Sequence, residues 1–179
     1  MEQSSLIAIE IAVVIFIIIP TVIAFIFGAP FVPTPMAAAE KMIELTGIQK
    51  GKKLYDMGCG DGRCVYIAAN KYDADAVGIE LTPWVYLIAR IRKFLWKSKA
   101  ILLMQNFRSV NISDADAVIF YLLPDSLKLL RQKLEKELKP GCRVVSYAFE
   151  IAGWKPVYVE PKKPEQNITR ILVYEIGKT

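Results

Sequence analysis

Two carboxylates bracket a glycine-rich turn, and their spacing indicates a site for a small molecule. The stretch is KKLYDMGCGDGRCVYIAANKYDADAVGIEL, residues 52–81. Asp56 stands two residues before the first of three alternating glycines, and Glu80 follows the last of them at a distance of 18 residues. Glycines this dense after an apolar strand let a ligand approach the backbone closely. The stretch therefore predicts a binding loop.

The spacing and charge of this loop exclude two common ligands. A dinucleotide fingerprint needs Gly-x-Gly-x-x-Gly, but position 63 is Arg, and the Gly-Lys-Ser/Thr that ends a phosphate-binding loop is absent. Asp56 and Asp61 disfavour a pyrophosphate and suit a cationic ligand. S-adenosylmethionine has a sulfonium and an α-ammonium group, and it fits this requirement.

Further polar residues stand at the ends of the next two predicted strands. Glu80 can accept hydrogen bonds from both ribose hydroxyls, and Asn106 is placed to reach an adenine edge. The site predicted for the cofactor comprises Asp56, Gly58, Cys59, Gly60, Gly62, Glu80, Leu81, Asn106 and Phe107. Residues at three successive strand ends make S-adenosylmethionine the expected cofactor.

The elements that position these residues alternate between strands and helices. We expect strands at 51–58, 74–81, 100–107, 115–123, 143–149, 154–160 and 168–176. We expect helices at 36–48, 63–70, 83–98 and 125–141. This order, with two final strands that no helix separates, predicts an α/β fold with a mostly parallel sheet and an antiparallel C-terminal strand. Ligands bind at the carboxyl ends of the strands in such sheets.

An apolar run precedes this domain. Leu6 to Phe27 contains Glu10 and Thr21 as its only clearly polar residues. As a helix it would extend roughly 33 Å, which is enough to cross a bilayer core of about 30 Å. The run therefore predicts a single-pass transmembrane helix rather than a cleaved signal peptide, since no basic segment precedes it.

The expected organisation has three parts: a transmembrane helix in residues 1–28, a proline-rich connector in 29–35 and a catalytic domain in 36–179. Lysines follow the apolar run but do not precede it, which predicts a cytoplasmic domain at the cell membrane. Small residues four apart, Ala8 with Ala12 and Ala24 with Gly28, favour a homo-oligomer through the helix.

Composition excludes several kinds of chemistry. The chain has 179 residues, no histidine and a formal net charge of +5. Imidazole-based metal or triad catalysis is therefore excluded. Cys59, Cys64 and Cys142 match no zinc pattern, so no metal site is expected. The scattered lysines are better explained by attraction to an anionic leaflet of the lipid bilayer than by nucleic-acid binding.

The motifs together resemble a known family. LYDMGCGDGR and GIEL resemble class I, Rossmann-like S-adenosylmethionine-dependent methyltransferases. The apolar helix followed by PFVPTP, DMGCGDGR, GIELTPW, FYLLP, LEKELKPGCRVVSYAF and WKPV is similar to the membrane-anchored protein-lysine N-methyltransferases that modify the ATP synthase c subunit and the adenine nucleotide translocase. The resemblance implies that Asp56, Gly58 and Gly60 hold the methionine end and Glu80 the ribose. It also implies a lysine acceptor in a membrane protein.

Transfer to lysine requires a neutral amine, which an apolar, aromatic pocket favours by desolvation. The residues expected to form the acceptor and catalytic site are Tyr121, Phe31 and Glu150. Tyr121 follows the fourth strand, Phe31 would form a lid with Pro33 and Thr34, and Glu150 could orient or deprotonate the amine. Tyr147 and Phe149 are as well explained by the core.

Two alternative functions remain open. The enzyme could methylate a lipid amine or a quinone, or the chain could be a membrane scaffold that has lost catalysis. Asp56, Gly58, Gly60 and Glu80 are all present, which argues against the scaffold.

Overall fold

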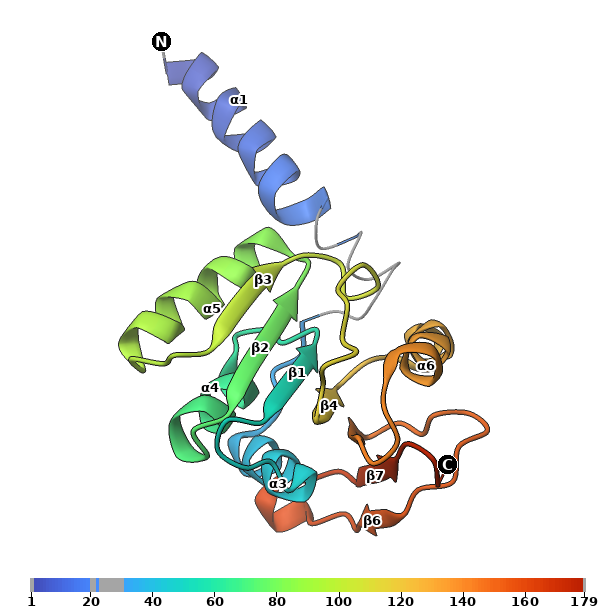
Figure 1. The fold of residues 1–179 in the computed structure, drawn as a ribbon. Helices are drawn as coiled ribbons and strands as arrows, with labels where there is room; N and C mark the ends of the chain where they lie inside the picture. The colour runs from blue at the N-terminus through green and yellow to red at the C-terminus, as the bar shows by residue number, and fades with distance from the viewer. Residues whose placement is uncertain (1, 20–21, 23–30, 179) are drawn as a thin grey trace.

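A computed structural model describes residues 2–19, 22 and 31–178, and in this part of the chain seven strands form one sheet in the order β3-β2-β1-β4-β5-β7-β6 (Figure 1). The strands are β1 (Lys53–Met57), β2 (Asp75–Glu80), β3 (Ile101–Met104), β4 (Ala117–Phe120), β5 (Arg143–Tyr147), β6 (Tyr158–Glu160) and β7 (Ile171–Glu175). Strands β1 to β5 are parallel, while β7 pairs antiparallel with both β5 and β6. The predicted Rossmann-like sheet is confirmed.

Helices cover both faces of this sheet. They are α3 (Met36–Thr46), α4 (Arg63–Lys71), α5 (Pro83–Leu95) and α6 (Pro124–Glu137). Met42 of α3 and Val65 of α4 share one buried cluster with Ile119 of β4. Leu130 of α6 belongs to a second cluster with Phe120. Because neighbouring residues of β4 point to opposite faces, α3 and α4 cover one face and α6 covers the other.

The connection between β6 and β7 explains the antiparallel end of the sheet. It contains the short 3-10 helix η2 (Pro164–Gln166) and a bridge between Lys163 and Ile168. A parallel neighbour needs a crossover of a dozen or more residues. This short return therefore runs antiparallel.

The N-terminal helix extends away from the sheet (Figure 1). α1 (Glu2–Val13) continues into the π-helical segment η1 (Val14–Ile18). No helix within the described ranges is both long and apolar enough to span a membrane. The predicted span, Leu6–Phe27, is not supported by these residues, and its positions 20–21 and 23–27 lie outside them.

Candidate active site

The glycine loop joins β1 to α4 and lies against the end of β2. The backbone N–H groups of Gly58 and Cys59 both donate to the carbonyl of Ile79, each at 2.9 Å. Gly58 and Gly60 have φ values of +89° and +56°, which residues with a Cβ adopt at a cost. The loop therefore turns sharply at the carboxyl edge of the sheet.

Glu80 fixes this loop from the neighbouring strand. Its Oε2 accepts the backbone N–H of Gly60 at 3.0 Å, and its Oε1 accepts that of Thr82 at 2.8 Å. Burial raises the pKa of Glu80, and the hydrogen bonds from Thr82 and Gly60 offset part of that effect. Each carboxylate oxygen keeps a second lone pair, so ribose hydroxyls can still bind there.

Asp56 is the second acid of the pocket and is almost completely buried. Burial raises its pKa to about 8, and the nearby carboxylates of Glu80 and Asp61 add to the shift. A buried carboxyl between other acids favours a cationic partner, because such a partner lowers the electrostatic cost of ionising it. The α-ammonium group of S-adenosylmethionine would meet this need.

Asp61 differs from Asp56 because two arginines neutralise it. Arg63 Nη2 lies 2.6 Å from Asp61 Oδ2, and Arg92 Nη1 contacts the same oxygen. Burial acts to raise the pKa of Asp61, but the bonds to Arg63 and the charge of Arg92 outweigh it, and the pKa is lowered. The idea that Asp61 repels a pyrophosphate is therefore not supported, because two arginines pair with its charge.

The proline-rich segment covers the glycine loop. A Cβ placed on Gly60 would lie 2.8 Å from Cε2 of Phe31, so the ring packs directly on the glycine. The ring of Phe31 also meets Trp84 edge to face, with centroids 5.9 Å apart. Arg63 Nη1 donates to the carbonyl of Thr34. Phe31 and Thr34 therefore form part of the pocket wall.

Aromatic rings line the other end of the pocket. Tyr121, just after β4, packs edge to face on Tyr147 at 4.9 Å and stacks on Phe149 at 6.3 Å between centroids. Burial, and secondarily Tyr147, raises the pKa of Tyr121, so its hydroxyl is neutral near pH 7. Tyr121 lines the pocket, whereas Tyr147 and Phe149 support it from behind.

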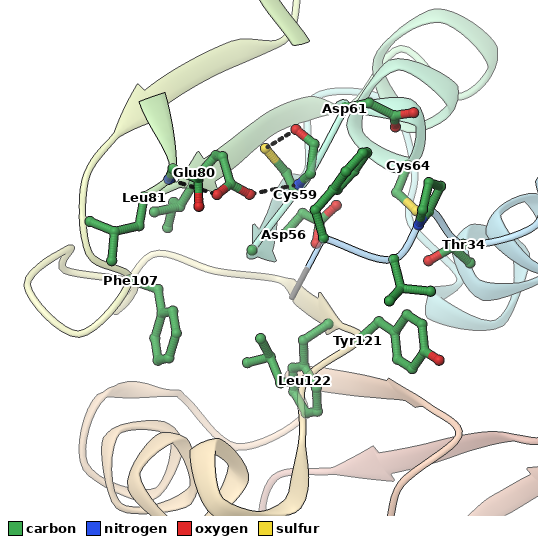
Figure 2. A pocket seen from close by; sticks show the side chains of 18 of the residues that line it. Thr34, Asp56, Cys59, Asp61, Cys64, Glu80, Leu81, Phe107, Tyr121 and Leu122 are labelled. Atoms are coloured by element: carbon green, nitrogen blue, oxygen red, sulfur yellow. Dashed lines mark hydrogen bonds between the residues drawn. The ribbon is translucent and has the colours of Figure 1, made fainter. Parts of the chain in front are cut away.

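The pocket has a volume of about 890 Å³, including the open space at its mouth. Figure 2 shows Leu81 and Phe107 at one end, Tyr121 at the other, and Glu80 and Asp56 between them. Ten of the predicted site residues line it: Phe31, Asp56, Gly58, Cys59, Gly60, Glu80, Leu81, Asn106, Phe107 and Tyr121. The acids in the middle and the glycines without Cβ atoms fit S-adenosylmethionine.

Asn106 lies where an adenine edge was expected, but its oxygen is already in use. Oδ1 accepts the backbone N–H of Arg108 at 3.0 Å. The oxygen retains one further lone pair for an exocyclic amine. Asn106 therefore has a structural role in the turn after β3 as well as a place in the pocket.

Two predicted site residues lie elsewhere. Gly62 begins α4, and a Cβ there would lie 2.4 Å from the ring of buried Tyr66, so this glycine makes room for packing. Glu150 is exposed and pairs with Arg170 at 2.8 Å, outside the residues that line the pocket. Gly62 therefore has a packing role, and Glu150 forms a surface ion pair.

Sequence reasoning missed several residues of the site. Thr82, Gln105 and Leu122 line the pocket, and Arg92 reaches it through Asp61. Thr82 and Gln105 are adjacent in sequence to the predicted residues Leu81 and Asn106, so including the neighbours of each predicted residue would have found them. Arg92 is 31 residues from Asp61, and no local pattern connects the two.

Comparison with known proteins gives matches over most of the chain. The sequence profile of the ANTKMT methyltransferase domain matches residues 56–158. The chain is 37% identical to the protein-lysine N-methyltransferase of Saccharolobus islandicus, over 87% of this chain and 98% of that protein. It is 34% identical to the mouse adenine nucleotide translocase lysine N-methyltransferase, over 72% of this chain but 58% of that protein.

Among solved structures, an RNA methyltransferase from Salinibacter ruber in complex with S-adenosyl-L-homocysteine is similar. It has a TM-score of 0.76 and 31% identity, and the match covers 83% of this chain and 95% of that one. S-Adenosyl-L-homocysteine is the product that remains when S-adenosylmethionine gives up its methyl group.

Proposed function

We propose that this chain, which belongs to the ANTKMT methyltransferase domain family and is an S-adenosylmethionine-dependent methyltransferase, methylates lysine side chains of a membrane-associated protein. The observation that carries the lysine assignment is the match with the archaeal protein-lysine N-methyltransferase, which extends over nearly the full length of that protein. The mammalian relatives, of which the chain spans little more than half, are named for lysines of the adenine nucleotide translocase and of the ATP synthase c subunit.

The residues of the pocket suit this reaction. When bound, S-adenosylmethionine supplies an electrophilic methyl group on a sulfonium. Ionised Asp56 would attract the ammonium end of the cofactor, and Glu80, which holds the glycine loop, would also hold the ribose. The chain then has to align an amine with the methyl group and keep that amine neutral.

The aromatic end of the pocket favours a neutral lysine. Tyr121, Phe31 and Leu122 remove water from an incoming amine, which lowers the amine's pKa from its reference value of about 10.4. The faces of the rings also attract a methylated ammonium product. No carboxylate is required as a base if the amine arrives neutral.

The N-terminal helix supports attachment to a membrane. The side chains of residues 3–19 are exposed and mostly apolar, so water is a poor environment for them. We infer that this helix holds the enzyme at a bilayer, with the catalytic domain on the cytoplasmic side. Attachment would raise the effective concentration of acceptors in the same membrane.

An RNA acceptor is the second candidate, because the similar solved structure is described as an RNA methyltransferase. RNA binding depends on basic residues that neutralise phosphates. Among the described residues that line the pocket, the basic one is Arg63, and its charge is paired with Asp61. The pocket wall therefore favours an amine over a nucleotide.

The test is to incubate purified enzyme and radiolabelled S-adenosylmethionine with membranes from the source cells. We expect protease-sensitive label and, by mass spectrometry, a methylated lysine. At a limiting cofactor concentration Glu80→Ala should lower the label strongly, while Glu44→Gln, on the exposed side of α3, should not. Label confined to lipid extracts, or to nuclease-sensitive material, would replace the lysine proposal with a lipid or an RNA acceptor.

A further inference from the structure

Helix α5 exposes an apolar stripe to solvent. Leu87, Ile91, Phe94 and Leu95 are 59%, 55%, 82% and 68% exposed. Their spacing of i, i+4, i+7 and i+8 is the one by which a helix of a soluble protein normally buries an apolar face. Here the buried face is a separate one, occupied by small or medium side chains such as Ala89. The exposed stripe is therefore additional to the core.

Basic residues flank this stripe. The segment from 83 to 99 contains Arg90, Arg92, Lys93, Lys97 and Lys99 and no acidic residue. Arg92 turns inward to Asp61, while Arg90, Lys97 and Lys99 are exposed. Apolar residues on one side and basic residues beside them are typical of helices that lie in the interface of an anionic bilayer.

The position of α5 connects this stripe with the N-terminal helix. Segment η1 contacts α5. From this region α1 runs away from the domain, while α5 runs along its edge beside β3 (Figure 1). The exposed apolar residues of η1 therefore belong to an element that contacts the helix carrying the stripe.

We propose that α5 lies in the headgroup region of an anionic phospholipid bilayer. Leu87, Ile91, Phe94 and Leu95 enter the acyl boundary, and Arg90 and Lys93 contact lipid phosphates. This inference extends the proposed membrane function to a defined surface of the catalytic domain. It names the anionic lipid surface itself as the partner of α5.

Such docking would orient the active site. Thr82, which precedes α5, donates its N–H to Glu80, and Arg92 on the inner side of α5 pairs with Asp61. A bilayer that holds α5 therefore holds both sides of the glycine loop. The pocket mouth would then sit at a fixed height above the bilayer.

Two other occupants fit the surface less well. RNA would use the basic residues, but it has no use for a stripe of Leu and Ile side chains. A second copy of this chain could cover the apolar residues, but it would bring the same basic residues against each other. Both occupants are outcomes of the test below.

The test places an environment-sensitive fluorophore at Phe94→Cys in the full chain, reconstituted in nanodiscs. Cys59, Cys64 and Cys142 are buried, so the label goes to the new thiol. The control is Lys128→Cys, an exposed position on α6, which covers the face of the sheet opposite to α3 and α4. We expect a blue-shifted emission at 94, quenched by brominated lipids, in phosphatidylglycerol nanodiscs and a water-like emission at 128.

A second experiment tests how much the basic residues of α5 contribute to lipid contact. Each Lys or Arg near an anionic surface contributes about fivefold to binding. Arg90→Glu with Lys93→Glu should therefore lower the equilibrium constant for docking, measured as the ratio of lipid-contacting to water-exposed label, by at least that factor. High salt or phosphatidylcholine alone should reduce the signal in the same direction.

Three results would overturn the proposal: a water-like emission at 94 in anionic nanodiscs, a blue shift without lipid that follows the protein concentration and a dimer mass, or a response to RNA in place of lipid. Methylation of a membrane protein in the presence of a water-like label at 94 would leave the proposed function intact. Lipid contact at position 94 without any methylated lysine would reject the proposed function but would support the proposed contact of α5 with the bilayer.

Discussion

The ring of Phe31 packs against Gly60, so closely that a Cβ on the glycine would lie 2.8 Å from Cε2 of the ring. This contact joins the proline-rich segment to the cofactor loop. Residues 31–34 of this segment thus also form part of the pocket wall. A change in this segment should therefore affect cofactor binding.

The first prediction concerns this contact. Gly60→Ala should weaken S-adenosylmethionine binding, because the new methyl group displaces Phe31 and φ of +56° is strained. Adding Phe31→Leu should recover part of the loss, since it relieves the clash but not the strain. Calorimetric Kd values of the four proteins in the double-mutant cycle measure this coupling. Strictly additive effects would contradict a direct contact.

The second prediction concerns Glu80, which accepts two backbone N–H groups. Glu80→Ala should weaken cofactor binding by about 10- to 100-fold, because hydrogen bonds to a charged group contribute about 1.5–3 kcal/mol. The cofactor affinity of Glu80→Gln should lie between those of the wild type and Glu80→Ala, because the NH₂ group of Gln must face one of the two backbone donors. Equal affinity of the Gln variant and the wild type would show that the charge is not needed.

The third prediction is a pH dependence of stability. Folding raises the pKa of Asp56 from 3.8 to about 8. The folded state therefore binds a proton more tightly than the unfolded one, and the stability from Asp56 is fully present below about pH 4 and is lost as the pH rises through about 8. In urea unfolding between pH 6 and 9, the wild type should lose free energy of unfolding relative to Asp56→Asn. Parallel curves for the two proteins would contradict the raised pKa.

The same ionisation should control cofactor affinity in the opposite sense. A cationic ammonium group prefers ionised Asp56, so the affinity of the wild type should increase from pH 6 to pH 8 and then level off. In Asp56→Asn the affinity should be low and should lack this rise. Calorimetry in buffers of different ionisation enthalpy would detect the proton released on binding.

The fourth prediction separates steric from backbone effects at Gly62. Gly62→Ala places a methyl group 2.4 Å from Tyr66, and Gly51→Ala has a similar φ of +71° with no atom within 4 Å. Both changes should cost about 1–2 kcal/mol from strain. Gly62→Ala should cost about 1–3 kcal/mol more from overpacking. Equal losses in thermal or urea unfolding would show that Tyr66 moves aside freely.

The fifth prediction tests the acceptor end of the pocket. Tyr121→Ala should lower kcat/KM for the lysine acceptor by about 3- to 30-fold, the range of a cation–π contact, with an unchanged Kd for S-adenosylmethionine. Tyr121→Phe should retain most of the activity, because the ring is kept. A loss with Phe as large as that with Ala would assign the effect to the hydroxyl.

The sequence determined the fold and most of the predicted residues that line the pocket, because both depend on local patterns. Apolar runs and glycine turns located the strands, and the position of Glu80 at a strand end placed it beside the loop of β1. In a parallel sheet the strand ends meet at one edge, so no knowledge of distant contacts was needed.

The tertiary structure decided everything that depends on residues far apart in the chain. It paired Asp61 with Arg92, packed the ring of Tyr66 against Gly62 and placed Glu150 outside the pocket. It also left one apolar face of α5 exposed. The period of an apolar pattern shows which residues share a face of a helix. Whether that face is covered depends on which other elements pack against it, and only the tertiary structure decides that.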